Sequence, residues 1–384
     1  MFRGVNDSVL KIIDSYDPDA PLEAASTIPS SWYTDPRIFE LEAQTVFSRS
    51  WHFAARADQL IGAGSYATTE IAGEPIVVVR GSDDELRGFF NVCRHHAAAV
   101  MTEPEGRTNH LRCPYHGWTY SLEGELKGMP DFSGVCDFDR AANGLAPIQT
   151  AVFEKWVFAR LGGKDDDSNG PVTDLAEFLG HNLIQQLRSF DFGNLHWFQR
   201  RRYELKCNWK VFVDNYLDGG YHVPHLHKGL DSVLDYSKYT IENGERFCLQ
   251  SSPMVAGNDE EVGAVRAGQR AFYYWLYPNF MLNYYEGTLD TNLVRPLAID
   301  RTEVIFDFYF ADVSEAARER NLASVTVGDR IQQEDLDICE SVQRGLNSRA
   351  YEAGRLSVRR EGGEHLFHRL LHADLKSGVS EARP

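Results

Sequence analysis

Two short segments, Cys93-Arg94-His95-His96 and Cys113-Pro114-Tyr115-His116, decide how the first half of this sequence folds. They read as Cys-x-His and Cys-x-x-His, so together they offer two thiolates and two imidazoles. Residues 88–92 lead into the first segment and residues 117–120 leave the second, and both stretches carry aromatic and β-branched residues typical of strands. We therefore predict two loops at the ends of short strands, each bringing one Cys and one His.

This ligand set suits a Rieske two-iron, two-sulfur centre, in which two Cys hold one iron and two His hold the other. The spacing selects Cys93, His95, Cys113 and His116 as cluster ligands. His96 stands beside the motif and is predicted to be a packing or supporting residue. A structural zinc is the alternative, but zinc fingers usually place two Cys before two His. Since a Rieske centre carries single electrons, the motif predicts a redox protein.

The composition is that of an ordinary globular protein. The chain has 384 residues, 43% of them hydrophobic, which allows two domains or one large one. No run of 18 apolar residues occurs, and the first residues lack a signal-peptide pattern, so we expect a cytoplasmic protein. A net charge of -17 disfavours a nucleic-acid partner. Four cysteines outside the motif are expected to be reduced core thiols: Cys136, Cys207, Cys248 and Cys339.

Changes in pattern along the chain divide it into three parts. Residues 1–50 combine short helical stretches with several prolines, and residues 51–150 consist of short strands and turns that would form the Rieske domain. A polar, Gly-rich loop is expected at 162–170. Helical and strand segments mix through 151–384, which is typical of an α+β catalytic domain.

A second metal site is indicated by residues 208–227, which contain three His and several acidic or amide side chains. Non-heme iron oxygenases bind Fe(II) with two His and one carboxylate and leave other positions open. We choose His222 and His227 as the ligand pair. His225 is a competitor, because spacing alone does not exclude it.

The pattern of a helix expected at 329–349 indicates a candidate for the carboxylate ligand. At about 100° per residue, its apolar residues share one stripe. The members of this stripe are Ile331, Ile338, Val342 and Leu346. Asp335 falls within the stripe, whereas Glu334, Asp337 and Glu340 point away from it. A carboxylate that faces a core needs a partner, and both Fe(II) and an arginine remain open for Asp335.

An aromatic stretch at 272–285 is the candidate substrate region. It reads as a hairpin around residues 278–279, and aromatic faces hold quaternary ammonium cations. The candidate substrate residues are Tyr273, Trp275, Tyr277 and Tyr284. An aromatic-ring or cinnamate-type substrate would suit the same surface, so this feature leaves the substrate open.

Over essentially its full length, the sequence resembles the catalytic α subunit of Rieske non-heme iron oxygenases. Within that family it is most similar to choline monooxygenase and its bacterial relatives that act on quaternary ammonium compounds. The segments that carry the resemblance are 30–36, 208–227, 277–281 and 333–346.

The resemblance implies an all-β Rieske domain and a helix-grip-like α+β catalytic domain with an antiparallel sheet. It also implies that the N-terminal helical segment packs on the catalytic domain. The four motif residues would hold the cluster, and His222, His227 and Asp335 would hold a mononuclear iron. Electrons would come from NAD(P)H through a separate flavin or iron-sulfur reductase, and dioxygen would be the co-substrate. The family implies a homo-oligomer, usually a trimer, in which electrons pass between neighbouring subunits.

The chain departs from the family at the carboxylate that bridges the two metal sites across subunits. That acid usually lies three residues before the first His ligand, where this chain has Gly219. Asp218, four residues before His222, is our candidate bridge, because residues four apart share a helix face. Asp214 extends the same face, and Asn215 beside it is a further candidate catalytic residue.

Three functions remain open at this point. The chain is expected to hydroxylate or N-demethylate a small quaternary ammonium compound. An aromatic-ring or aromatic-acid hydroxylating dioxygenase is the second reading. A Rieske electron-transfer protein without oxygenase activity is the third.

Overall fold

The computed structural model describes residues 7–161, 174–255 and 260–381, so the loop expected at 162–170 lies outside the described residues. The chain divides into two compact units, one comprising Phe47–Phe178 and the other Met1–Val46 with Leu179–Pro384. The N-terminal segment therefore belongs with the second unit. The sequence placed the later boundary at 150, which falls inside a strand of the first unit.

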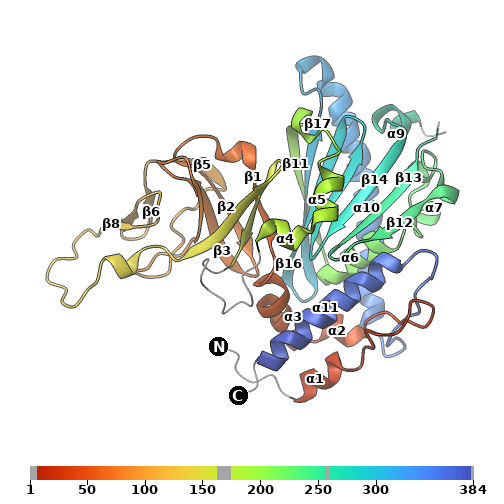
Figure 1. The fold of residues 1–384 in the computed structure, drawn as a ribbon, viewed down its shortest axis with the longest axis horizontal. Helices are drawn as coiled ribbons and strands as arrows, with labels where there is room; N and C mark the ends of the chain where they lie inside the picture. The colour runs from red at the N-terminus through yellow and green to blue at the C-terminus, as the bar shows by residue number, and fades with distance from the viewer. Residues whose placement is uncertain (1–6, 162–173, 256–259, 382–384) are drawn as a thin grey trace. The chain divides into compact units, whose positions relative to one another are not determined.

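The first unit is built on a 7-stranded antiparallel sheet and a smaller 3-stranded sheet (Figure 1). In sheet order, the large sheet contains β1 (His52–Arg56), β10 (Trp156–Arg160), β9 (Pro147–Phe153), β4 (Leu86–Phe90), β3 (Glu74–Arg80), β2 (Ser65–Ile71) and β5 (Glu105–Arg107). The small sheet contains β6 (Leu111–Arg112), β7 (Thr119–Tyr120) and β8 (Leu126–Gly128). Single turns of 3-10 helix lie at Ala57–Leu60 and Ala141–Asn143.

Strand β3 shows why this sheet has a core on both faces. Its residues 76–79 are apolar without alternation and fully buried, as expected for a strand covered on both sides. Val77 and Val79 join one hydrophobic cluster, which also contains Cys93 and Cys113. Ile76 and Val78 join the other. The two motif loops are thus anchored on one of the two cores.

The second unit is a mixed α+β structure with a 7-stranded antiparallel sheet (Figure 1). In sheet order, its strands are β11 (His196–Leu205), β17 (Arg301–Phe310), β16 (Thr288–Ala298), β15 (Phe280–Tyr285), β14 (Arg270–Leu276), β13 (Phe247–Pro253) and β12 (Thr240–Asn243). The N-terminal helices are α1 (Asp7–Ile13), α2 (Ser30–Thr34) and α3 (Pro36–Glu42). The predicted α+β class is confirmed, as is the hairpin around residues 278–279, which β14 and β15 form.

The remaining helices include those that carry the candidate site residues. They are α4 (Leu175–Leu179), α5 (His181–Leu187), α6 (Trp209–Leu217), α7 (Val223–Leu226), α8 (Lys228–Asp231), α9 (Glu260–Val265), α10 (Arg318–Leu346) and α11 (Gly362–Glu381). Helix α6 packs on β16 and on both long helices, α10 and α11. The long helix α10 also packs on β11 and α9. This contact set holds α6 between the sheet and the C-terminal helices.

The cysteines outside the motif are free thiols. Cys207, Cys248 and Cys339 are buried, as predicted, but Cys136 is exposed. The prediction of a core thiol at Cys136 is therefore wrong, because the segment around it runs over the surface of its unit.

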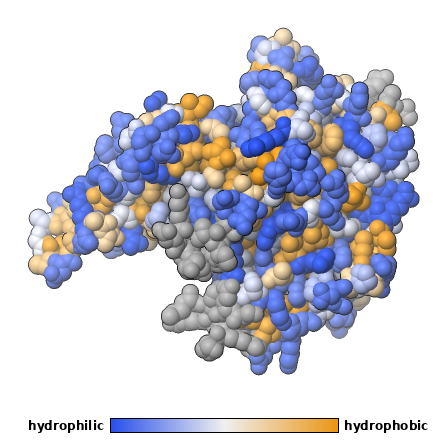
Figure 2. Space-filling model, viewed as in Figure 1, coloured by the Kyte–Doolittle hydropathy of each residue, from blue (hydrophilic) through white to orange (hydrophobic). Residues whose placement is uncertain are grey.

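The face shown in Figure 2 is mostly hydrophilic, with hydrophobic residues scattered among the polar ones. Within the described ranges, no helix combines the length and the apolar character needed to cross a membrane. Helix α10 carries the exposed hydrophobic side chains Leu322, Ile338 and Val342. The sequence had placed Ile338 and Val342 in a core-facing stripe.

A buried ion pair ties α3 to α6. Lys210 Nζ lies 2.6 Å from Glu42 Oε1, and both side chains are inaccessible to solvent. Trp209 Nε1 donates to the other carboxylate oxygen at 2.8 Å. Burial raises the pKa of Glu42 and lowers the pKa of Lys210, and the attraction between the two charges opposes both shifts.

Removing one partner of this pair should destabilise the second unit. Glu42→Gln leaves the Lys210 ammonium buried without a counter-charge, which costs about 3–5 kcal/mol. The double variant Glu42→Gln/Lys210→Met removes both charges and should regain much of that loss. Urea unfolding of the two variants and the wild type measures the difference. A single variant as stable as the wild type would contradict the role of the pair.

Candidate active site

The two Cys-x-His loops have the same backbone construction. In each, the Cys N–H donates to the carbonyl five residues later and the Cys carbonyl accepts from the N–H four residues later, at 2.8 and 3.0 Å for Cys93 and 2.8 and 3.1 Å for Cys113. Ala97 and Gly117 hold equivalent positions and have positive φ angles of 58° and 74°. This conformation is unfavourable for a residue with a Cβ, so the fold of the loop must hold Ala97 in it.

The four motif side chains gather at the ends of these loops. The two Cys are buried, His95 is half-buried and His116 is exposed, and the two imidazole centroids lie 4.7 Å apart. His95 Nδ1 is buried and has no hydrogen-bond partner among the described residues. A buried ring nitrogen without a partner is costly, so it fits an atom that ligates a metal. The hydroxyl of Tyr120 lies 3.5 Å from Cys93 Sγ.

The arrangement of these four residues fits a two-iron cluster better than one zinc ion. Tetrahedral zinc needs its ligand atoms to converge on one point. In the described part of the chain, the groups of His, Cys, Asp or Glu atoms that converge in this way lie elsewhere. His96 is exposed rather than packed in the core, although its ring centroid lies 4.2 Å from that of His95.

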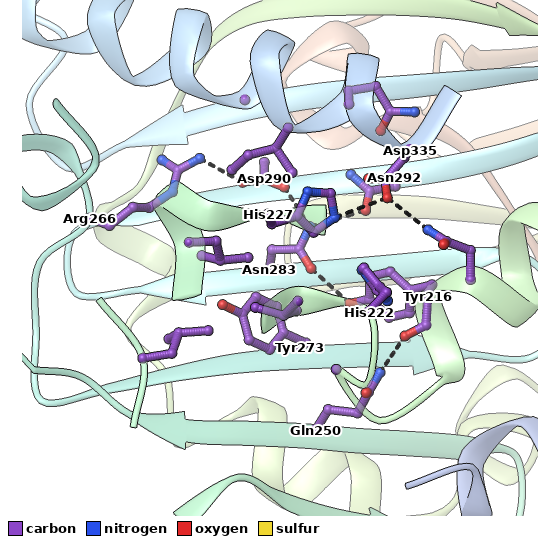
Figure 3. Close-up of a pocket in the computed structure, with 18 of the residues that line it drawn as sticks. Tyr216, His222, His227, Gln250, Arg266, Tyr273, Asn283, Asp290, Asn292 and Asp335 are labelled. Carbon is purple, nitrogen blue, oxygen red and sulfur yellow. Dashed lines mark hydrogen bonds and ion pairs between the residues drawn. The ribbon is translucent and has the colours of Figure 1, made fainter. Parts of the chain in front are cut away.

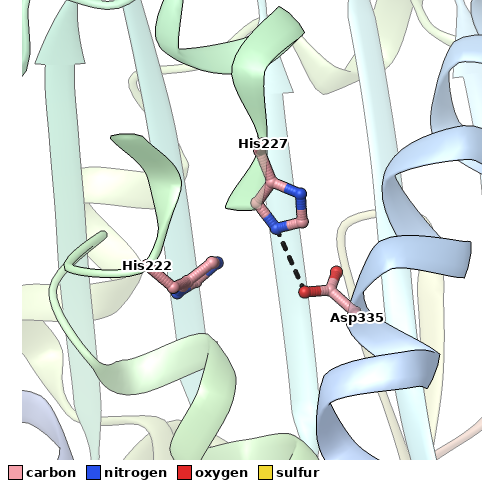
Figure 4. A group of neighbouring side chains, drawn as sticks. All are labelled: His222, His227 and Asp335. Atoms are coloured by element: carbon pink, nitrogen blue, oxygen red, sulfur yellow. Dashed lines mark hydrogen bonds and ion pairs between the residues drawn. The ribbon is translucent and has the colours of Figure 1, made fainter. Parts of the chain in front are cut away.

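A second group of candidate ligands is formed by His222, His227 and Asp335, shown in Figure 4. One ligand atom from each lies within 4.8 Å of the others. His222 precedes α7, His227 follows it, and Asp335 projects from α10. Two segments distant in sequence, the ends of α7 and the middle of α10, therefore bring together the two imidazoles and one carboxylate that suit Fe(II).

Each histidine of this group is oriented by a carboxylate on its Nδ1 atom. Asp218 Oδ2 lies 2.6 Å from His222 Nδ1, and Glu334 Oε2 lies 2.6 Å from His227 Nδ1. His227 Nε2 then points at Asp335 Oδ1, 3.1 Å away. Burial would lower the pKa of His227, but Asp335 and Glu334 outweigh burial and raise it. Carboxylates behind metal-binding imidazoles are the usual supporting arrangement.

Asn215 links α6 to this group. Its Nδ2 donates to Asp335 Oδ1 at 2.8 Å, so the candidate residue Asn215 contacts a candidate ligand directly. Asp335 is nearly buried, as the sequence predicted, and its partners are His227 and Asn215 rather than an arginine.

The helical stripe that singled out Asp335 is wrong in detail. Ile338 and Val342 are exposed, whereas the buried face of the C-terminal half of α10 carries Gln332, Cys339 and Gln343 together with Leu346. Glu334 was predicted to point away but contacts His227. The cause is that α10 buries polar residues against α6 and the cavity, so apolar periodicity does not report its inner face.

His225, the competing ligand, is exposed on α7 and does not belong to the ligand group. The segment from 218 to 222 also differs from the expected helix, because α6 ends at Leu217. Asp218 accepts from the backbone N–H of Tyr221 and His222 at 3.1 and 2.9 Å. Asp218 therefore reaches His222 across a turn and not along a helix face.

The local structure at Gly219 explains why this chain has no bridging acid three residues before His222. Gly219 has a φ of 69°, and a Cβ there would lie 2.1 Å from the carbonyl oxygen of Arg360. A side chain is therefore excluded by backbone conformation and by space. Asp214 does not share a face with Asp218 toward the metal group, because it accepts from Tyr33 at 2.5 Å and lies 3.0 Å from His368 Nε2.

A cavity adjoins the second ligand group, with about 830 Å³ of space between atoms, part of it open to solvent. One row across the sheet forms much of its wall, since Gln250, Tyr273, Asn283, Asp290 and Phe308 are paired neighbours on successive strands. Figure 3 shows Asn283, Tyr273 and Gln250 of this row below His227, and Asp290 beside it. The aromatic residues of the wall include Tyr216, Tyr239, Tyr273, Tyr285, Phe306 and Phe308.

Only part of the predicted substrate region lines this cavity. Tyr273 does, and its hydroxyl lies 2.9 Å from that of Tyr285. Trp275 packs on Phe367, and Tyr277 donates to Asp374 at 2.6 Å, both on α11. Each two-residue step moves the side chain about 6.6 Å along the strand, so Trp275 and Tyr277 lie beyond the cavity.

Tyr284 points to the opposite face of the sheet, where it packs on Phe190 with ring centroids 4.5 Å apart. The sequence analysis missed Tyr239, Arg266 and Asp290 as wall residues. No signal in the sequence pointed to Asp290, because residues 288–292 are mostly polar and their burial in β16 is known only from the structure. Burial raises the pKa of Asp290, and Arg266 opposes that rise.

Comparison with protein families assigns both units. Residues 50–139 match the Rieske [2Fe-2S] domain, and residues 192–377 match the catalytic domain of the ring hydroxylating alpha subunit. Choline monooxygenase of Arabidopsis thaliana is 40% identical over 96% of this chain and 87% of its own length. The chain belongs to the Rieske non-heme iron oxygenase family. The readings as a zinc-stabilised protein and as an electron-transfer protein alone are therefore discarded.

Other relatives agree with this family assignment. The oxygenase subunit of carnitine monooxygenase from Escherichia coli (strain K12) is 30% identical over 91% of this chain and 92% of its own. A solved structure of a quaternary ammonium Rieske monooxygenase has a TM-score of 0.81 and 27% identity, covering 94% of this chain and 96% of that one. Naphthalene 1,2-dioxygenase, at 18% identity and a TM-score of 0.76, shares the fold. The cofactors of the oxygenase are thus a Rieske cluster and a mononuclear iron.

The supporting carboxylates should control metal affinity in the second site. Asp218→Asn and Glu334→Gln each remove the charge behind one imidazole, so the affinity for mononuclear iron should fall about 10–100-fold. Iron retained during competition with a chelator measures this, and the cluster's visible spectrum should not change. Asp337→Asn, an exposed acid on the same helix as Glu334, is the matched control. Unchanged iron retention in both variants would show that these contacts do not support the metal.

Proposed function

We propose that the oxygenase uses dioxygen and externally supplied electrons to hydroxylate a small quaternary ammonium compound, by monooxygenation or N-demethylation. The observation that carries the proposal is the aromatic wall of the cavity beside His222, His227 and Asp335. Aromatic faces attract a permanently charged ammonium group, which cannot donate hydrogen bonds, by about 0.5–2 kcal/mol each.

Relatives support this substrate class. The chain resembles choline monooxygenases from several plants and carnitine monooxygenase oxygenase subunits from bacteria. A related quaternary ammonium Rieske monooxygenase has been solved with L-carnitine and with gamma-butyrobetaine, at 27% identity to this chain. These relatives act on different compounds, so they support a class and not one member of it.

We assign each metal centre to residues of this chain. Cys93, His95, Cys113 and His116 would hold the cluster. His222, His227 and Asp335 would hold the mononuclear iron, which, when bound and reduced, supplies the activation of dioxygen. The unpartnered Nδ1 of His95 and the carboxylates behind both histidines support these roles.

The protein residues around the iron site would orient the two histidines, position the substrate and exclude water from it. Asp218 and Glu334 keep the two Nε2 atoms turned toward Asp335. Tyr216 donates to Asn283 at 2.7 Å, and Asn283 donates to Asp290 at 2.6 Å, so the polar part of the wall is internally hydrogen-bonded. The aromatic residues would exclude water from the ammonium group and hold its methyl groups near the metal.

Electron delivery would involve other chains. We propose a separate reductase that takes electrons from NAD(P)H, and a homotrimer in which the cluster of one subunit serves the iron of its neighbour. The exposed imidazole of His116 supports such a docking. Asp218, partly accessible behind His222, is our candidate for the connecting carboxylate.

Turnover of a small substrate panel tests the function. With a generic reductase, NAD(P)H- and oxygen-dependent product should form from quaternary ammonium compounds and not from aromatic acids of similar size. Oxygen uptake and product analysis by mass spectrometry are the readouts. Product from the aromatic acids alone would overturn the proposal in favour of an aromatic hydroxylase.

Asp335→Ala tests the division into two metal sites. Turnover and the mononuclear iron should be lost, so total iron should fall from about three to about two per chain, since a Rieske cluster contains two irons. The cluster's visible and paramagnetic spectra should persist. Loss of the cluster as well would show that the two-site assignment is wrong.

A further inference from the structure

A buried arginine stands in the wall of the cavity and is not needed to bind a simple cation. Arg266 follows α9, is 5% exposed, and lines the same cavity as the ligand group. A guanidinium is always charged and can present five donors to an acceptor. An arginine in a cavity for a permanent cation would repel that cation, so its presence calls for an explanation.

The contacts of Arg266 satisfy only part of this donor set. Its Nη1 donates to Ser324 Oγ at 2.6 Å, and its guanidinium lies over the ring of Tyr285, 4.9 Å from the centroid. Asp290 is the neighbouring carboxylate, but Arg266 Nη2 lies 3.9 Å from Asp290 Oδ1, longer than a hydrogen bond. Asp290 is instead engaged by Asn283.

The unpartnered buried atoms of the wall are all donors. Among the described residues that line the cavity, they are Arg266 Nε, Asn292 Nδ2 and Gln332 Nε2. A buried donor without an acceptor costs about 1–3 kcal/mol. Spare donors in the wall are complementary to a ligand that brings acceptor oxygens.

The position of Arg266 separates this donor region from the metal site. Figure 3 shows Arg266 at one end of the drawn pocket, with Asp290 beside it, and Asp335 at the other end. In the same view Tyr216 is drawn below Asp335, and Tyr273 is drawn lower in the pocket, toward the middle. A ligand with an anionic end and a cationic end can therefore contact the donor region at Arg266 and the region near Asp335 at the same time.

We infer that the substrate is a quaternary ammonium carboxylate, a betaine, and that Arg266 is the specificity-determining residue that binds its carboxylate. This inference rests on the proposed function and narrows it. The carboxylate accepts from the guanidinium, and the ammonium group lies among the aromatic side chains nearer the iron ligands. A neutral zwitterion adds no net charge to the cavity, whereas an ammonium alcohol adds a positive charge and brings no carboxylate to the guanidinium, whose neighbouring anion Asp290 lies 3.9 Å from Nη2.

A ligand series on the wild-type oxygenase tests this without any substitution. Glycine betaine and choline share the trimethylammonium group and differ in the carboxylate. Glycine betaine methyl ester keeps the shape but loses the negative charge, and 3,3-dimethylbutanoate keeps the carboxylate but replaces the nitrogen with carbon. Calorimetric titration without reductase measures binding in the absence of turnover.

Glycine betaine should bind about tenfold or more tightly than choline and the methyl ester, the increment expected for a charged hydrogen bond. Choline or the ester binding as tightly as glycine betaine overturns the inference but leaves the proposed function standing. Equal binding of 3,3-dimethylbutanoate, or no binding by any trimethylammonium probe, contradicts the proposed function as well.

Substitution of the arginine gives the second test. Arg266→Gln should abolish the preference for glycine betaine and should not weaken choline binding, because the charge that repels the choline cation is removed; Arg266→Lys should keep part of the preference. Arg330→Gln is the matched control, because Arg330 is partly exposed and bonds Glu261 of α9 at 3.1 Å. The cluster spectrum and thermal midpoint verify folding. An Arg266→Gln protein that is folded and retains the full preference overturns the inference.

Discussion

The second metal site depends on two short contacts between carboxylates and imidazoles. Asp218 holds the Nδ1 of His222, and Glu334 holds the Nδ1 of His227. Once both Nδ1 atoms are engaged, the Nε2 atoms are left as candidate ligands, and Asp335 completes a group of two imidazoles and one carboxylate that could hold a metal ion. Because Glu334 and Asp335 are adjacent on α10, one turn of that helix supplies both a ligand and the support of another.

The surrounding packing serves to bring α6 and α10 to this point. Helix α6 packs on β16, α10 and α11, and the buried Lys210–Glu42 pair fastens it to α3. Asn215 on α6 then reaches Asp335 on α10. The end of α6 is set by Gly219, whose left-handed backbone and contact with Arg360 turn the chain so that Asp218 faces His222.

The cavity combines two kinds of wall that suit different chemistry. The aromatic side chains offer faces to a cation, whereas Arg266, Asn292 and Gln332 carry unpartnered donors. A single cationic ligand would use only the first, and a carboxylate alone would use only the second. The proposed betaine would use both kinds of wall, so the charge pattern of the wall supports a narrower substrate class than family membership does.

The motif residues show which parts of the candidate site can be predicted from residue spacing alone. Cys93, His95, Cys113 and His116 could be selected from the sequence, because each Cys and His pair lies within one loop whose geometry is local. His222 and His227 could be selected for a similar reason, since they flank the single short helix α7. The choice against His225 needed the structure, because exposure is not encoded in a spacing of two or three residues.

Asp335 was found for an incomplete reason. The predicted apolar stripe on α10 is not the buried face of the helix, since Ile338 and Val342 are exposed. Asp335 nevertheless faces inward. Polar residues dominate the buried face there because they meet α6, the ligand group and the cavity. Periodicity of apolar residues cannot describe a helix whose inner face is functional.

The sequence by itself determined the α+β class and the hairpin at β14 and β15, and it predicted the cluster motif and the histidine pair, because each rests on residues close together in the chain. Only the tertiary structure decided that Glu334 supports His227, that Trp275, Tyr277 and Tyr284 lie outside the cavity, and that Arg266 lies within it. These facts depend on which strands pair and which helices cross, and such long-range contacts leave no periodic signature in the sequence.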